Sequence, residues 1–190
     1  MSKVILGLTI SLDGFAEDIN GSVNPLYSDL EQLEESEVMT EFKTKTGAVV
    51  MSGKEFYMAD DLDGYADGYE FQGPIFIFTD KVPDKHPKEN DLISFTFVTS
   101  GVDDAIREAK VVAGDKDVNI IGSALTAQLC LKTDLIDELQ VDIIPRFLNE
   151  GYRPFDNIGD LNKRVERILV KELPAGRVHI RYNILTIGKF

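Results

Sequence analysis

Two hydrophobic periods alternate along the chain. Runs of about four to eight apolar or alternating residues predict strands, and longer stretches with apolar residues three and four positions apart predict amphipathic helices. Strands are predicted within residues 3–14, 47–52, 75–79, 92–98, 117–121 and 135–144. The last segment, residues 164–188, holds two alternating runs joined at Pro174, Ala175 and Gly176, which predicts a long hairpin.

Helical periodicity marks the segments between these strands. Residues 25–46 set an apolar face against an acidic face, with a break in register near Glu35. Residues 100–114 form the clearest predicted helix, in which Ser100 and Asp103 resemble a capping box and Gly114 occupies the C-cap. Its predicted buried face consists of Val102, Ala105, Ile106, Ala109, Val112 and Ala113. Shorter helices are predicted after Gly53 and after Gly122.

This order of elements predicts the fold class. The first strand is apolar on both sides, which is typical of a strand at the centre of a sheet. Strands that alternate with helices predict an α/β fold of three layers: a mainly parallel mixed sheet, helices on both faces, and a C-terminal antiparallel hairpin. We expect residues 1–190 to form a single domain, because domains usually contain about 50 to 250 residues.

Charge and composition exclude several function classes. The chain has 20 Lys and Arg residues against 33 Asp and Glu residues, a net charge of −13, and such a surface repels nucleic acid. We find no apolar run long enough for a membrane span and no signal peptide, so we expect a cytoplasmic protein. Cys130 is the only cysteine, and His86 and His179 are far apart in the sequence, so no metal site is predicted.

Three strand ends carry the candidate chemistry. Ligands of open α/β sheets bind beyond the carboxyl ends of the strands, where the following helices point their N-termini. The three ends are residues 52–55, 79–81 and 122–124. At Gly122 a phosphate could approach the backbone, and the free amides of the next helix favour negative charge. The alternative is that this glycine only makes a tight strand-to-helix turn.

Lys54 and Asp13 are the charged candidates. Lys54 begins a predicted helix, where the helix dipole disfavours a cation unless an anion lies nearby, so it favours a bound phosphate. The alternative is an ordinary solvated lysine. Asp13 closes the first strand beside Gly14, where an aspartate serves as an acid, as an acceptor that orients a ligand, or as a turn former.

Together these motifs resemble the reductase domain family of bacterial riboflavin biosynthesis, which has the dihydrofolate reductase-like fold. The resemblance covers nearly the whole chain. It is carried by SLDGFAE at 11–17, VVMSGKEFY at 49–57, VNIIGSALTAQLCLKTDLIDELQVDIIPRFLNEGYRPF at 118–155 and GRVHIRYNIL at 176–185. The zinc deaminase that is often fused to this domain requires HxE and PCxxC motifs, which this chain lacks.

The resemblance implies an NADPH site. The pyrophosphate would lie at the helix after Gly122, the adenosine phosphates near Gly53 and Lys54, and the nicotinamide and substrate near residues 9–14, with Asp13 orienting a polar substrate group. The residues expected at the cofactor are Thr9, Gly14, Gly53, Lys54, Glu55, Thr79, Lys81, Gly122, Ser123 and Ala124. Four residues depart from the family pattern: Lys54 replaces Arg, Phe56 replaces Thr, and Ser123 and Asn149 replace Gly. With Asp80 beside the predicted adenosine site, NADH is not excluded.

The resemblance predicts an NADPH-dependent reductase of a small heterocyclic substrate, of the ribosylaminopyrimidine or pterin class, acting as a homodimer. The alternative, motivated by the four departures, is a non-catalytic binding or assembly protein that keeps the fold. A third hypothesis, a true dihydrofolate reductase, requires a buried acid in the first long helix. The acids available there, none of which lies clearly on the apolar face, are Asp29, Glu31, Glu34 and Glu35.

Overall fold

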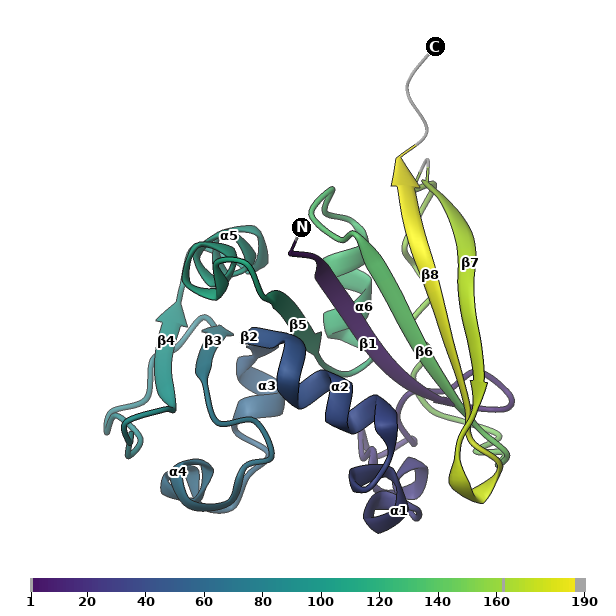
Figure 1. The fold of residues 1–190 in the computed structure, drawn as a ribbon, viewed down its shortest axis with the longest axis horizontal. Helices are drawn as coiled ribbons and strands as arrows, with labels where there is room; N and C mark the ends of the chain where they lie inside the picture. Colours follow the sequence, from purple (N-terminus) through teal and green to yellow (C-terminus); the bar gives the residue numbers. More distant parts are fainter. Residues whose placement is uncertain (1, 162, 187–190) are drawn as a thin grey trace.

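One eight-stranded sheet forms the centre of the protein (Figure 1). The computed structural model describes residues 2–161 and 163–186. The strands are β1 (Val4–Ser11), β2 (Thr46–Ser52), β3 (Pro74–Phe78), β4 (Ser94–Val98), β5 (Asp117–Ile121), β6 (Glu138–Ile144), β7 (Lys163–Glu172) and β8 (Val178–Thr186). Their order is β4-β3-β2-β5-β1-β6-β8-β7, so the doubly apolar β1 lies between β5 and β6, as its sequence predicts.

The sheet is parallel from β4 to β6 and antiparallel at its C-terminal side. The five pairings among β1 to β6 are parallel, and β8 pairs antiparallel with both β6 and β7. The last strand of the chain therefore inserts between β6 and the edge strand β7, with η3 (Pro174–Gly176) as the turn of the hairpin. The predicted three-layer α/β fold with its final hairpin is confirmed.

Two apolar cores lie on opposite faces of the sheet. Successive side chains of β2 point to different cores: Val50 belongs to one core, and Val49 and Met51 belong to the other. The first core packs under α5 (Val102–Ala113) and α6 (Ala124–Leu131). The second packs under α3 (Gly53–Phe56), α4 (Tyr65–Gly68) and the end of α2 (Glu37–Lys45). Figure 1 accordingly shows α2 and α6 on opposite sides of the sheet.

The predicted helix over residues 25–46 is divided. It consists of η1 (Asn24–Leu26), α1 (Leu30–Glu34) and α2. Ser36 separates α1 from α2, and its hydroxyl accepts a hydrogen bond from the amide of Met39 as the N-cap of α2. The acidic segment after Tyr57, for which no helical period is predicted, contains η2 (Leu62–Gly64) and α4.

The helix predicted over residues 100–114 is confirmed as α5, with two corrections. Val112 is 54% exposed, whereas Ala105, Ile106, Ala109 and Ala113 are buried. The predicted capping box is absent, because Gly101 is the N-cap with φ 111°, a conformation that glycine adopts without strain. Gly114 at the C-cap has φ 61°, as its position predicts.

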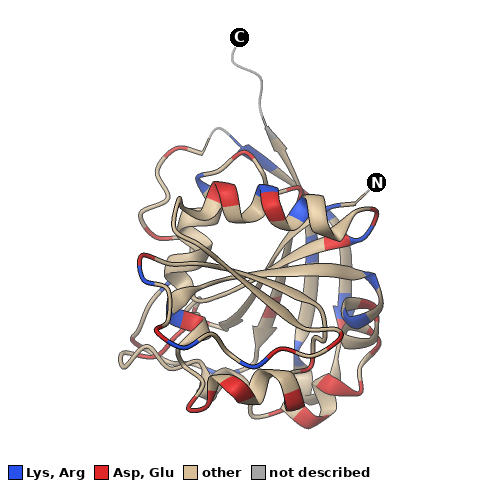
Figure 2. Ribbon diagram, turned by 90° about the vertical axis from the view of Figure 1, so that its left-hand side faces the viewer, with Lys and Arg blue, Asp and Glu red and all other residues tan. Residues whose placement is uncertain are grey.

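Figure 2 shows Asp and Glu residues spread over the helices and loops that surround the sheet. None of the helices in the described part of the chain is long and apolar enough to cross a membrane.

Candidate active site

Two cavities lie at the carboxyl ends of the parallel strands. The first, of about 190 Å³, is bounded by Gly7 to Thr9 of β1 and by Ile121 and Gly122 at the end of β5. The second, of about 420 Å³, is bounded by the ends of β2 and β3 and by Leu125, Thr126 and Leu129 of α6. The turn from β5 into α6 therefore has one cavity on each side. We call them the substrate cavity and the lysine cavity.

Paired residues of β6 and β8 form the polar floor of the substrate cavity. Asp142 lies opposite His179 in the antiparallel register, and Gln140 lies opposite Arg181. Asp142, His179 and Gln140 line the cavity. Side chains two positions apart on a strand share a face, so the two strands together place four polar groups on one side of the sheet.

Arg177, which directly precedes β8, belongs to the same polar floor and binds two carboxylates. Its guanidinium donates to both oxygens of Asp29, at 2.9 and 2.7 Å, and to Oδ2 of Asp142 at 3.0 Å. Arg177 is completely buried, so its charge is compensated by protein groups alone. The hydrogen bonds from Arg177 lower the pKa of Asp29, which stays ionised.

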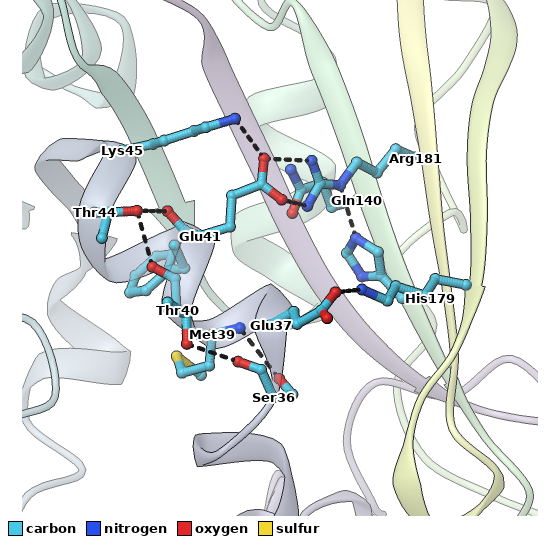
Figure 3. Close-up of polar contacts among 12 residues, drawn as sticks. Ser36, Glu37, Met39, Thr40, Glu41, Thr44, Lys45, Gln140, His179 and Arg181 are labelled. Atoms are coloured by element: carbon cyan, nitrogen blue, oxygen red, sulfur yellow. Dashed lines mark hydrogen bonds and ion pairs between the residues drawn. The ribbon is translucent and has the colours of Figure 1, made fainter.

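The protonation of His179 follows from its two partners. Arg181 Nε approaches His179 Nε2 at 2.9 Å, and because arginine has no acceptor, the Nε2 lone pair must accept this hydrogen bond. His179 Nδ1 therefore carries the proton and donates to Asp142 Oδ1 at 2.7 Å in a neutral ring. Figure 3 shows how Arg181 continues the chain of contacts to Glu41 of α2. Hydrogen bonds from Arg181 lower the pKa of Glu41 to about 2.

The apolar wall of the substrate cavity comes from the divided helix. Leu30 and Leu33 of α1 and Val38, Met39 and Phe42 of α2 all line it. The sequence pattern predicts an apolar face here, and the structure shows that part of this face borders a cavity. Leu30 is 45% exposed and Leu33 only 6%. A flat aromatic ligand in this cavity would contact the apolar side chains of α1 and α2 and residues of β1.

The lysine cavity brings together four residues predicted for the cofactor. Gly53, Lys54, Thr79 and Lys81 all line it, together with Asp80. Tyr57 adds an aromatic wall and donates from its hydroxyl to the carbonyl of Lys81 at 3.0 Å. A lysine ammonium offers three donors to a phosphate, so this cavity suits an anionic ligand.

Two carboxylates of the protein occupy the N-terminus of α6. The amide of Ser123 donates to Glu55 Oε1 at 2.9 Å, and the amide of Ala124 donates to Glu17 Oε1 at 3.0 Å. The Glu17 carboxylate, whose side chain is 2% exposed, also binds Lys54 Nζ at 2.7 Å. A pyrophosphate can bind these amides only after both carboxylates move away.

One polar group at the N-terminus of α6 is available to a ligand. The hydroxyl of Ser123 is the one buried side-chain polar atom without a hydrogen-bond partner among the described residues. The glycines, in contrast, serve internal packing. A Cβ on Gly122 would lie 2.4 Å from Thr126, and one on Gly53 would lie 2.6 Å from Thr79. The residues thus fit the adenosine phosphates at the lysine cavity, while the pyrophosphate end requires Glu17 and Glu55 to rearrange.

Comparison with known proteins identifies the chain. The model of the RibD C-terminal domain matches residues 2–178. The chain belongs to the RibD C-terminal domain family. The predicted membership of a reductase family is thereby confirmed. No curated protein matches this member of the family.

Solved structures share the fold of this RibD C-terminal domain at low sequence identity. A Shewanella sp. PV-4 protein provisionally assigned to riboflavin biosynthesis has a TM-score of 0.71 and 18% identity, covering 96% of this chain and 99% of that one. A Thermotoga maritima diaminohydroxyphosphoribosylaminopyrimidine deaminase/5-amino-6-(5-phosphoribosylamino)uracil reductase has a TM-score of 0.63 and 12% identity, and the match covers 96% of this chain and 56% of that one. Dihydrofolate reductase from Enterococcus faecalis, complexed with NADP(H), has a TM-score of 0.56 and 13% identity, and the match covers 96% of each chain.

Three of the four departures from the family pattern have structural explanations. Phe56 is fully buried and its ring lies 5.0 Å from that of Tyr65. Asn149 has φ 66°, a conformation that asparagine tolerates better than most residues other than glycine. Lys54 has its ion pair with Glu17. Only Ser123, with its unpartnered hydroxyl, remains without an internal explanation.

Asp13 and Asp29 have structural partners in this RibD C-terminal domain. The Asp13 carboxylate accepts hydrogen bonds from the amides of Leu148 and Asn149, and Asp13 lines neither cavity. Gly14, which has φ 88°, also lies outside both cavities. Asp29 is the buried acid that the dihydrofolate reductase hypothesis requires, but Arg177 binds both of its oxygens and it does not line the substrate cavity.

The polar floor is the part of the site that sequence reasoning missed. Glu138, Gln140 and Asp142 alternate with apolar residues in one strand, and Arg177, His179 and Arg181 do so in another. Such alternation is typical of a strand with one face in solvent, so the sequence does not distinguish these polar groups from an ordinary exposed face, and only the pairing of β6 with β8 brings them together.

Proposed function

We propose that this RibD C-terminal domain is an NADPH-dependent reductase of a small heterocyclic substrate. The observation that carries the proposal is the pair of cavities on either side of the β5–α6 turn, one lined by lysines and the other by apolar and acceptor groups. A dinucleotide across this turn would place its phosphates at one cavity and its nicotinamide at the other.

The residues of the chain would bind and orient, while the cofactor supplies the hydride. Lys54, Lys81 and Thr79 would hold the adenosine phosphates. Thr9 Oγ1 accepts a hydrogen bond from the Tyr27 hydroxyl at 3.1 Å, which orients both groups at the wall of the substrate cavity. The apolar residues of α1 and α2 would exclude water from the reacting ring.

The alternative of a non-catalytic binding protein is favoured by one observation. The carboxylates of Glu17 and Glu55 already satisfy the α6 amides that a pyrophosphate would need. Reversion to the family residues, with Lys54→Arg and Ser123→Gly, separates the two functions. A large gain in NADPH affinity indicates a decayed site, and no gain or a loss indicates a working variant.

The direct test is a titration of the purified chain with NADPH, followed by nicotinamide fluorescence and by the melting temperature. A ligand at 100 times its Kd should stabilise the folded state by about 2.7 kcal/mol. No change in either signal at millimolar NADPH, with NADH as the second cofactor tested, would exclude the reductase. Consumption of NADPH in the presence of candidate heterocycles then establishes turnover.

We also propose that the chain forms a homodimer in the cytoplasm. The edge strand β7 supports the dimer, because Val165, Ile168, Leu169 and Val170 are between 37% and 51% exposed, and an apolar edge strand is a common site of association. The cytoplasmic location is proposed because the reductase would draw on the NADPH pool of the cell. Light scattering of the chain and of a Val165→Glu, Val170→Glu variant tests the dimer, which the two charges should dissociate.

A further inference from the structure

The charges around the substrate cavity indicate which substrates it can take. Its ionisable lining residues are Tyr27, Glu70, Asp142 and His179, and no lysine or arginine among the described residues lines it. The lysine cavity, in contrast, contains Lys54 and Lys81. A phosphate in the substrate cavity would face carboxylates without a cation in the lining, and like charges at close range repel each other.

Four cations close to the substrate cavity are bound to carboxylates, and a fifth, Lys43, interacts electrostatically with Glu70 without lining the cavity. Arg177 is held by Asp29 and Asp142. A neighbouring hollow of about 90 Å³ shares Val38, Phe42 and Gln140 with the cavity. Three cations line this hollow, and each has a partner there: Lys3 pairs with Glu138, and Lys45 and Arg181 pair with Glu41. A phosphate entering the hollow would have to displace a carboxylate.

The two carboxylates of the cavity have free capacity to accept hydrogen bonds. Glu70 is an exposed residue, and its carboxylate has no hydrogen bond or ion pair with another side chain in the described part of the chain, although Lys43 interacts with it electrostatically. Each oxygen of Asp142 accepts one hydrogen bond, from His179 and from Arg177, and a carboxylate oxygen can accept about two. The cavity is therefore rich in acceptors with few free donors.

We propose that the substrate cavity binds an unphosphorylated nitrogen heterocycle that presents amino groups or a protonated ring nitrogen to Glu70 and Asp142. This inference rests on the proposed function for the location of the site, and it narrows the substrate to a neutral or cationic ring. The apolar residues of α1 and α2 suit the faces of such a ring, and the carboxylates suit its donor edge.

Calorimetry without cofactor tests the proposal, using 2,4-diaminopyrimidine as the donor-rich probe and uracil as its counterpart. A second pair, uridine and uridine 5′-monophosphate, differs only by the phosphate. Competition against bound 2,4-diaminopyrimidine confines the measurement to the substrate cavity, because a nucleotide could also bind at Lys54 and Lys81. The variant Glu70→Gln is compared with Glu108→Gln, an exposed glutamate on α5.

We expect 2,4-diaminopyrimidine to bind more tightly than uracil, and Glu70→Gln to weaken its binding a few-fold, as the loss of a charged hydrogen bond to an exposed carboxylate predicts. Uridine should displace the probe more readily than its monophosphate. Stronger displacement by the monophosphate, or equal affinity of the Glu70→Gln and Glu108→Gln proteins, would overturn the proposal. Because no NADPH is present, a chain that binds the probe but not NADPH would refute the proposed reductase and leave the cavity assignment standing.

Discussion

The substrate cavity and the lysine cavity differ in how their polar groups are held. The floor of the substrate cavity stands on two paired strands, and Arg177 and His179 are almost completely buried there, each bound to Asp142. The lysine cavity is built from strand ends and short helices, and the Lys54 side chain is 44% exposed. Buried paired charges are costly to separate, and the partner of Lys54, Glu17, is itself buried. The substrate cavity is thus preorganised, whereas the carboxylates of Glu17 and Glu55 must move before a pyrophosphate can bind the α6 amides beside the lysine cavity.

The largest expected effect comes from breaking the floor of the substrate cavity. Arg177→Met would leave Asp29 and Asp142 without their buried partner, so the free energy of unfolding should fall by about 3–5 kcal/mol in urea titrations. The double variant Asp29→Asn, Arg177→Met should recover part of this loss. The control is Arg107→Met, whose partners Asp103 and Asp104 are exposed. Similar losses in the two single variants would mean that the floor is not preorganised.

The next effect concerns the carboxylate at the α6 N-terminus. Glu17→Gln removes a negative charge from the proposed pyrophosphate position and frees Lys54, and glutamine can still accept from the Ala124 amide. We expect the Kd for NADPH in a fluorescence titration to fall about tenfold, since charge effects at helix N-termini reach about 1–2 kcal/mol in partly buried sites. Glu108→Gln is the control for charge alone. Unchanged or weaker binding by Glu17→Gln would show that this carboxylate does not compete with the cofactor.

A smaller effect is expected from Asp80, which lines the lysine cavity beside Lys81. Its carboxylate should oppose the additional phosphate of NADPH more than it opposes NADH. Asp80→Asn should therefore raise the ratio of NADPH to NADH affinity by a few-fold, on the order of 0.5–1 kcal/mol for an exposed charge. Asp91→Asn, at an exposed position outside the cavity, should leave the ratio unchanged. An equal change in both variants would assign the effect to net charge.

The smallest effect is the pH dependence of the link between α2 and the floor. Hydrogen bonds from Arg181 lower the pKa of Glu41 from 4.5 to about 2, so this carboxylate stabilises the folded state above its ordinary pKa. The stabilisation is lost as the pH falls through the lowered value. The difference in unfolding free energy between the native chain and Glu41→Gln should thus be larger at about pH 6 than at about pH 3. A difference that is independent of pH would show that the ionised Glu41 carboxylate does not stabilise the folded state.

Much of the fold was predictable, because local patterns carried it. The apolar alternation of β1 and the helical spacing of α5 gave the correct element types, and the turn at Pro174 to Gly176 gave the hairpin. The failures occurred where local signals were weak or overridden. Val112 has helical spacing but points to solvent. The pattern located a break in register near Glu35 but did not show that α1 and α2 are separate helices divided at Ser36.

The candidate site was predictable only in part. Gly53, Lys54, Thr79 and Lys81 do come together at one cavity, as the rule for the carboxyl ends of parallel strands predicts. That rule places strand ends and does not describe what fills the space between them. Glu17 and Glu55, which bind the α6 amides, come from different strand ends, and only their folded positions reveal the contact.

The sequence by itself determined the element types, the central position of β1, the anionic surface and the family, because each follows from neighbouring residues or from a local motif. The tertiary structure alone decided that β8 lies between β6 and β7, that Asp142 faces His179, and that two carboxylates close the N-terminus of α6. The contact between Glu17 and the Ala124 amide, for example, joins residues 107 positions apart. The energies of such contacts depend on burial and distance, which local periodicity does not contain.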